Sequence, residues 1–135
     1  FRSVEDIQRF VSFSQKCHSR HTASFDESCS VFSSYRVEDA HPARMYFIND
    51  QTIEPVLGAE SEYQCQDLSD CFHRNGCFYS FSTSAILNNT LYSPNLYHFP
   101  MSYSSSINID TIVDFNIAKL AYPSFLDGLL SVLPE

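Results

Sequence analysis

Two oxygen-bearing side chains stand two residues apart near the C-terminal end of the chain. They are Asn108 and Asp110, within the segment Ser-Ile-Asn-Ile-Asp that covers residues 106–110. In an extended segment, residues two apart point to the same side, so both side chains present oxygen atoms together. Mg²⁺ prefers oxygen ligands and commonly shares them with phosphate groups. The spacing therefore suits a magnesium site, although these five residues alone favour a simpler reading in which Asp110 caps a following helix.

A second polar segment lies in the middle of the chain. Gln66-Asp67-Leu68 is followed by His73, Arg74 and Asn75, and then by Gly76 and an apolar run. Asn-Gly ahead of a strand is typical of a turn. A turn that also carries Asn, Arg and His side chains can line a binding site, but these residues by themselves predict only the turn.

Helical and strand patterns alternate along the chain, which predicts the α/β class. A capping-box pattern at Ser3 and Asp6 begins the first helix, and Pro123 is expected to end the helix that follows Asp110. The second and third predicted strands form a hairpin. The predicted helices cover residues 3–16, 82–88, 111–121 and 124–133, and the predicted strands cover residues 29–37, 45–48, 53–56, 77–81 and 96–99.

Composition limits the classes of partner. Sixteen acidic residues against eight basic ones give a formal net charge of −8. A nucleic-acid-binding surface needs clustered cations to displace counterions from phosphates, and the sequence has no such cluster. No apolar run approaches the roughly 20 residues that span a bilayer. We therefore expect neither a nucleic acid nor a membrane as partner.

The five cysteines have no C-x-x-C spacing, and their number is odd. This pattern favours reduced thiols and a cytoplasmic protein. A different interpretation is a small secreted domain with disulfides and a glycan at Asn88, which begins an Asn-Asn-Thr sequon. A hydrolase is disfavoured because the chain has no G-x-S-x-G motif.

Several short motifs follow one another in the order found in a known family. They are His41-Pro42, Ile53-Glu54-Pro55, Gln66-Asp67-Leu68, Asn75-Gly76 with Tyr79, and Ser106-Ile107-x-Ile109-Asp110 with Asp114. In this order and spacing the chain resembles the CMP–sialic acid synthetases, the cytidylyltransferases that activate sialic acids. The opening residues 1–7 look like the family segment that follows a central Gln-Pro-Thr-Ser-Pro stretch, so the resemblance runs from Phe1 to about Leu120.

The resemblance implies a fold and a reaction. The expected fold is a partial Rossmann-like nucleotidyltransferase domain of the α/β class with a small dimerisation hairpin, and residues 1–135 would form the single C-terminal portion of it. The family reaction transfers CMP from CTP to the anomeric oxygen of a nine-carbon sialic-type sugar acid, releases pyrophosphate, and is assisted by Mg²⁺. The expected partners are CTP, the sugar acid, and either a second copy of the chain or a complementing N-terminal half.

The resemblance also assigns roles to individual residues. Asn108 and Asp110 match the Asp-x-Asp that binds metal, and Asp110 would also be catalytic by orienting the sugar hydroxyl. The implied substrate-binding residues are Arg44, Gln66, His73 and Asn75.

Three positions depart from the family pattern. Asn108 stands where the family has Asp, and Cys65 and His73 stand where it has Arg. An arginine fork grips a carboxylate or phosphate in two places, which a cysteine or a neutral histidine cannot do. The glycine- and basic-rich nucleotide loop of the family would precede Phe1. We therefore expect the chain by itself to be inactive, with a non-catalytic interaction or regulatory module as the alternative function.

Overall fold

The structure is a computed structural model, and it describes residues 2–21 and 28–126. The chain divides into two compact units. Unit 1 comprises Phe1–Tyr35 and Arg74–Glu135, and unit 2 comprises Arg36–His73. Helices and strands are mixed along the chain, as the α/β prediction required.

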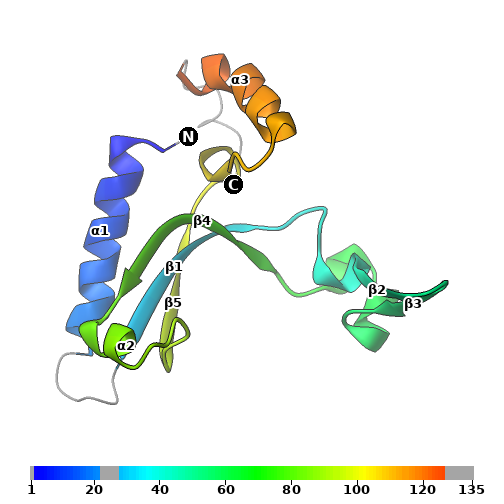
Figure 1. The fold of residues 1–135 in the computed structure, drawn as a ribbon, viewed down its shortest axis with the longest axis horizontal. Helices are drawn as coiled ribbons and strands as arrows, with labels where there is room; N and C mark the ends of the chain where they lie inside the picture. The colour runs from blue at the N-terminus through cyan, green and yellow to red at the C-terminus, as the bar shows by residue number, and fades with distance from the viewer. Residues whose placement is uncertain (1, 22–27, 127–135) are drawn as a thin grey trace. The chain divides into compact units, whose positions relative to one another are not determined.

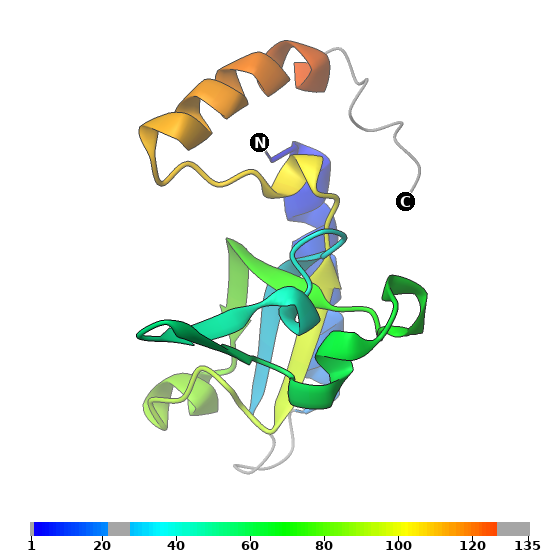
Figure 2. The ribbon, with the colours of Figure 1, turned by 90° about the vertical axis from the view of Figure 1, so that its right-hand side faces the viewer.

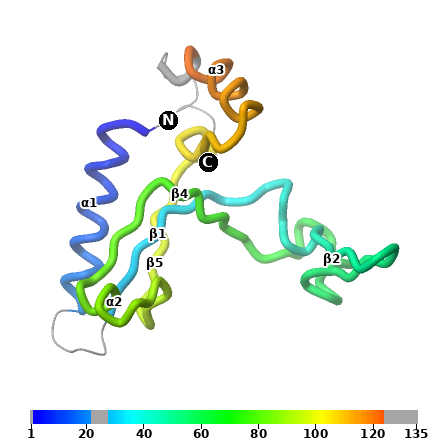
Figure 3. The backbone as a smooth tube through the Cα atoms, in the orientation of Figure 1, coloured from blue at the N-terminus to red at the C-terminus, as the bar shows by residue number. Residues whose placement is uncertain are grey.

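A three-stranded sheet forms the centre of unit 1, with strand order β4–β1–β5. The strands are β1 (Cys29–Arg36), β4 (Phe72–Phe81) and β5 (Asn95–Pro100). β1 and β5 are parallel and lie side by side, with Cys29 opposite Asn95 (Figure 3). Six consecutive residues of the central strand, 29–34, are buried. A run of this kind is expected for a strand that has neighbours on both edges and is packed on its faces.

Helix α1 (Val4–Ser19) covers one face of this sheet (Figure 1; Figure 2 shows the helix behind the strands). The predicted capping box is confirmed, because Ser3 and Asp6 bond reciprocally at the start of the helix. The Phe10 ring lies 4.9 Å from the Phe78 ring and 5.4 Å from the Phe99 ring. The buried cluster beneath the helix consists of Phe10, Cys17, Cys29, Val31, Phe99 and Met101.

The Asn75-Gly76 pair does not form a turn ahead of a strand, and this prediction was wrong. Both residues lie inside β4, which begins at Phe72 rather than at Cys77. Gly76 has a φ of 70°, a left-handed conformation that glycine adopts without strain. The Phe78 N–H donates to the Ser33 hydroxyl oxygen of β1 at 2.8 Å. The positive φ is thus absorbed as an irregularity within the strand, as in a β-bulge.

Unit 2 contains the predicted hairpin. β2 (Tyr46–Asn49) and β3 (Thr52–Pro55) pair in antiparallel fashion, with Asn49 opposite Thr52. Asp50 turns the chain with a φ of 54°, a conformation that Asp tolerates better than most residues. Three 3₁₀ helices accompany the hairpin, at Pro42–Arg44, Gly58–Glu62 and Cys65–Asp67.

The last helix differs from its prediction. Helix α3 (Ile112–Leu126) continues through Pro123, which was expected to end it. The preceding α-helix, α2 (Thr83–Leu87), is short. A proline removes one helical hydrogen bond and commonly bends a helix without ending it. The prediction of a separate helix at residues 124–133 is therefore wrong for residues 124–126, which belong to α3. The rest of that predicted helix lies outside the described residues. No helix of the described residues has the length and apolar character needed to cross a membrane.

Candidate functional site

The structure brings the side chains of Asn108 and Asp110 together. The Asn108 amide Nδ2 donates a hydrogen bond to Asp110 Oδ2 at 2.8 Å, and both residues are exposed. They lie between the 3₁₀ helix Ser104–Ser106 and α3. Within the described part of the chain, this amide is the only hydrogen-bond partner of the Asp110 carboxylate.

The cap of α3 is built from other residues than Asp110. Thr111 Oγ1 accepts from the Asp114 N–H at 3.2 Å, and Asp114 Oδ2 accepts from the Thr111 N–H at 2.8 Å. The Thr111 hydroxyl also donates to the same carboxylate at 2.7 Å. This hydroxyl bond, with the backbone N–H bonds beside it, lowers the pKa of Asp114. The prediction that the Asp110 side chain caps this helix is therefore wrong, and the Asp110 carboxylate is available for another role.

The oxygen atoms of Asn108 and Asp110 could bind a divalent cation only if further ligands came from another molecule. Among the described residues, no group of three or more His, Cys, Asp and Glu side chains could hold a metal ion. Asp110 offers one carboxylate, and Asn108 offers its amide oxygen once the amide has rotated away from its present bond. Mg²⁺ is commonly held by one or two protein oxygens plus substrate phosphates. The pair therefore fits Mg²⁺ if phosphate oxygens complete the coordination.

A cation that the sequence did not reveal lies beside this segment. Arg2 donates to the Ile107 carbonyl at 3.5 Å and lies 2.8 Å from the Cys77 sulfur. Arg2 and Ile107 are separated by 105 positions in the sequence. A local sequence pattern cannot indicate a contact over that separation, so Arg2 was not predicted as part of the site.

Asn75, an expected substrate-binding residue, lies in the core of unit 1 with 5% of its surface exposed. Its Oδ1 accepts from the Ser33 hydroxyl at 2.6 Å and from the Cys77 N–H at 3.1 Å. Its Nδ2 donates to Ser106 Oγ at 2.7 Å and contacts Met101 Sδ at 3.4 Å. An amide side chain has two acceptor and two donor positions, so all four are used inside the protein.

The other expected substrate-binding residues belong to unit 2. The Arg44 guanidinium donates to the backbone carbonyls of Ser61 and Tyr63, and so fastens the loop that follows the hairpin. The same guanidinium lies 3.9 Å from the sulfur of Cys65. Gln66 is exposed and donates to Gln64 at 3.0 Å. His73 is an exposed residue at the start of β4.

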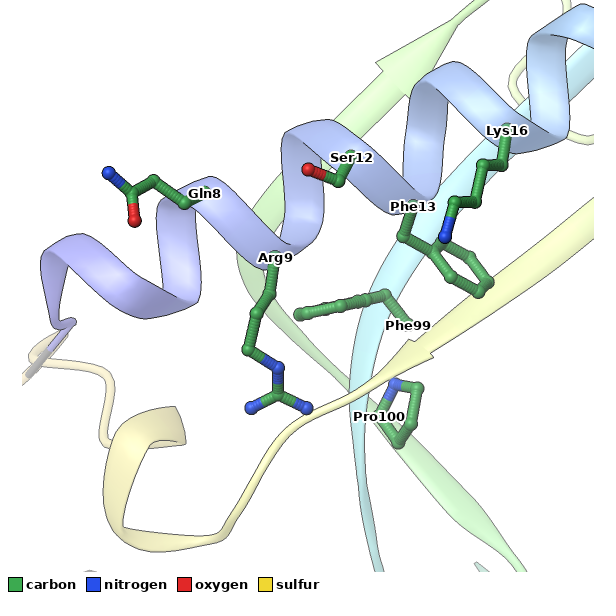
Figure 4. A pocket seen from close by; sticks show the side chains of 7 residues that line it. All are labelled: Gln8, Arg9, Ser12, Phe13, Lys16, Phe99 and Pro100. Carbon is green, nitrogen blue, oxygen red and sulfur yellow. The ribbon is translucent and has the colours of Figure 1, made fainter.

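A groove of about 470 Å³ runs between α1 and β5 in unit 1 (Figure 4). Its ionisable lining groups, Arg9 and Lys16, are both basic, and the Arg9 guanidinium lies 5.7 Å from the centre of the Phe99 ring. Gln8, Ser12, Phe13 and Pro100 complete the lining. None of the residues predicted from the sequence lines this groove.

We compared the chain with protein-family models and with curated proteins. No protein-family model matches the chain, and no curated protein matches it. The resemblance to the CMP–sialic acid synthetases therefore depends on the order and spacing of the motifs in the sequence.

Proposed function

We propose that the chain is the C-terminal portion of a cytidylyltransferase that transfers CMP from CTP to a nine-carbon sialic-type sugar acid. The observation that carries the proposal is the exposed pair Asn108–Asp110, whose side chains are 2.8 Å apart. Asp110 offers a carboxylate, and Asn108 would offer its amide oxygen after the amide has rotated away from its present bond, so the pair could supply two oxygen ligands of the kind that Mg²⁺ takes. The chain would act together with a nucleotide-binding half, because its own net charge of −8 is unfavourable for a triphosphate.

The position of the pair in the fold supports this proposal. The segment 102–110 follows β5, which runs parallel to β1. In open α/β sheets, ligands bind beyond the carboxyl ends of the parallel strands. The Asn108–Asp110 pair comes from such an end, so a partial Rossmann-like domain is the fold that we propose for unit 1.

Each side chain of the pair has a distinct part in the proposed reaction. Asp110 and the amide oxygen of Asn108 would hold Mg²⁺ together with phosphate oxygens, and the ion would neutralise negative charge on the transferring phosphoryl group. The Asp110 carboxylate would accept a hydrogen bond from the anomeric hydroxyl of the sugar acid and so orient it. Arg2, beside Ile107, is the described cation next to this segment.

The hairpin of unit 2 supports the expected dimer. Phe47, Ile48 and Ile53 are exposed apolar residues on its two strands. A two-stranded hairpin is only marginally stable in water by itself. We propose that the hairpin pairs with a second copy of the chain, which would cover these side chains.

One observation favours the non-catalytic alternative. Every hydrogen-bonding position of Asn75 is used within the core, so its amide offers nothing to a substrate in this structure. Cys65 and His73 also replace arginines of the family pattern. A module that keeps the fold and its contacts with other proteins, and has lost turnover, would show these features.

Isothermal titration with CTP and with N-acetylneuraminate, each with and without Mg²⁺, tests the proposed function. Mg²⁺-dependent binding that disappears in Asp110→Ala, and persists in the exposed-carboxylate control Asp39→Ala, would support a retained site. If the folded chain binds neither compound, catalysis by this chain is left without support, and the interaction module becomes the better proposal.

A further inference from the structure

The Arg74 guanidinium of unit 1 lies on an aromatic cluster that no sequence motif indicated. Its central carbon is 5.5 Å from the centre of the Phe32 ring and 5.9 Å from that of Tyr79. Arg74 also donates to the Tyr92 hydroxyl at 3.1 Å. Phe32 lies at the centre of this cluster. Its ring centre is 5.4–5.9 Å from the ring centres of Tyr79, Phe81 and Tyr92.

The charge of Arg74 has no partner of opposite sign in the described part of unit 1. The one ion pair of the described residues joins Arg36 to Asp70, in unit 2. Other basic residues of the described chain also lack an ion pair, so what distinguishes Arg74 is its position on the aromatic cluster. Within the described part of the chain, Arg74 uses one of its five N–H donors, on Tyr92. The remaining donors include a fork that matches a carboxylate in two places.

The guanidinium is held in place before any ligand arrives. Aromatic rings attract a cation lying over their faces, and the hydroxyl bond to Tyr92 fixes its orientation. The backbone is anchored by the next residue, Asn75, whose amide is bonded inside the core. An arginine that is already ordered loses less conformational entropy on binding an anion.

Two rings of the cluster remain open to solvent. Tyr79 and Tyr92 keep 44% and 65% of their surfaces exposed, whereas Phe32 is buried beneath them. A tyrosine offers an apolar ring face and a hydroxyl that forms hydrogen bonds. A cation beside two such rings suits a small anion that also has an apolar face and several hydroxyl groups.

We propose that Arg74, Tyr79 and Tyr92 form a subsite for the carboxylate end of a sugar acid. Arg74 binds the carboxylate through its free donors, and the exposed tyrosine rings contact the C–H groups of the sugar. Tyr92 is a positioning residue, since its hydroxyl orients the guanidinium. This inference rests on the proposed function for its choice of ligand, because it names the group that would hold the acid's carboxylate.

Titration of the whole chain with N-acetylneuraminate and with its methyl ester tests the subsite. We expect the free acid to bind at least about tenfold more tightly than the ester, because the ester lacks the charge that the guanidinium recognises. Arg74→Gln should weaken binding of the acid by about tenfold or more, and should leave binding of the ester nearly unchanged. Tyr92→Phe should have a smaller effect in the same direction.

Arg9→Gln is the matched control. Arg9 is likewise an exposed arginine close to a phenylalanine ring, 5.7 Å from Phe99, but among the described residues no hydrogen bond or ring contact joins it to a tyrosine. It should bind the acid as the wild-type chain does. Urea unfolding of each variant checks that a weakened affinity does not come from loss of the fold.

Several results would overturn the subsite. They are equal affinity for acid and ester, unchanged affinity in Arg74→Gln, equal losses in Arg74→Gln and Arg9→Gln, or no binding of the acid at millimolar concentration. Competition by inorganic phosphate as strong as that by the acid would replace the carboxylate site with a general anion site. Failure of the proposed function gives a different result, in which the acid binds through Arg74 but Mg²⁺ and Asp110→Ala have no effect on CTP or on the acid.

Discussion

The side-chain amide of Asn75 joins Ser33 to Ser106, accepting from the first hydroxyl at 2.6 Å and donating to the second at 2.7 Å. These two serines lie on β1 and in the 3₁₀ turn before the Asn108–Asp110 segment. One buried residue of β4 therefore connects the central strand to the segment that carries the candidate site. Its role in this structure is to position the site, and it does so from the core.

Replacing Asn75 with alanine should cost about 2–4 kcal/mol of unfolding free energy. The change removes several buried hydrogen bonds and leaves the Ser106 hydroxyl and the Cys77 N–H without the amide partner. Urea unfolding followed by circular dichroism measures the difference. Asn108→Ala serves as the control, since this asparagine is exposed, and it should lose less than about 0.5 kcal/mol. Equal losses in the two variants would contradict the role given to Asn75.

Gly76→Ala should destabilise unit 1 by about 1–2 kcal/mol, because the left-handed backbone conformation at this position is strained for alanine and unstrained for glycine. Steric overlap is not the cause, since an added Cβ would lie 3.7 Å from the Tyr79 hydroxyl oxygen. The midpoint of thermal unfolding should fall accordingly. An unchanged midpoint would show that the strand relaxes to a negative φ at this position.

Stability should depend on pH through His18, whose Nε2 is bonded to the Ser80 hydroxyl at 2.8 Å. Burial, aided by the neighbouring His21, lowers the pKa of His18 from its ordinary value of 6.5. Because the unfolded chain then binds the proton more readily, the contribution to stability is complete above pH 6.5 and is lost as the pH falls through the folded pKa. Unfolding free energies should rise with pH from about pH 5 to about pH 6.5, and this contribution should then level off toward pH 8.

His18→Gln should flatten that pH dependence relative to the wild-type chain. His98→Gln provides the comparison, because His98 is an exposed histidine on β5. The prediction fails if both variants keep the slope of the wild-type protein.

Asn108→Asp should tighten Mg²⁺ binding in the presence of CTP by about tenfold, since a second carboxylate would replace the neutral amide beside Asp110. Titration calorimetry with Mg²⁺ measures the change. Asn89→Asp adds the same charge at an exposed turn, where Asp tolerates the φ of 52°, and should have no effect. Equal affinities of Asn108→Asp and the wild-type chain would argue against this site for the metal.

The hairpin of unit 2 should govern self-association. Ile48 on β2 keeps 77% of its surface exposed, and Leu87 on α2 keeps 70%. If the hairpin forms the dimer contact, Ile48→Ser should weaken the dimer by about tenfold or more, and Leu87→Ser should leave it intact. Sedimentation equilibrium compares the two variants. A wild-type chain that is monomeric at high micromolar concentration would remove the basis of the dimer proposal.

Local patterns predicted much of the secondary structure. The capping box of Ser3 and Asp6, the hairpin around Asp50 and the buried strand at residues 29–36 all depend on neighbours within a few positions. Two of the errors concern a glycine and a proline that were expected to lie outside an element. Gly76 accommodates its positive φ without leaving β4, and Pro123 lies inside α3. Glycine and proline mark irregular backbone, but neighbouring contacts decide whether an element ends there.

The sequence by itself determined the α/β class, most element positions, and the pairing of Asn108 with Asp110, because each follows from the geometry of an extended or helical backbone over a few residues. Only the tertiary structure decided that Asn75 is buried, that Arg2 lies beside Ile107, and that Arg74 rests on the rings of Phe32 and Tyr79. Such contacts join residues far apart in the chain. Their existence depends on how the strands and helices pack, and no spacing in the sequence records that.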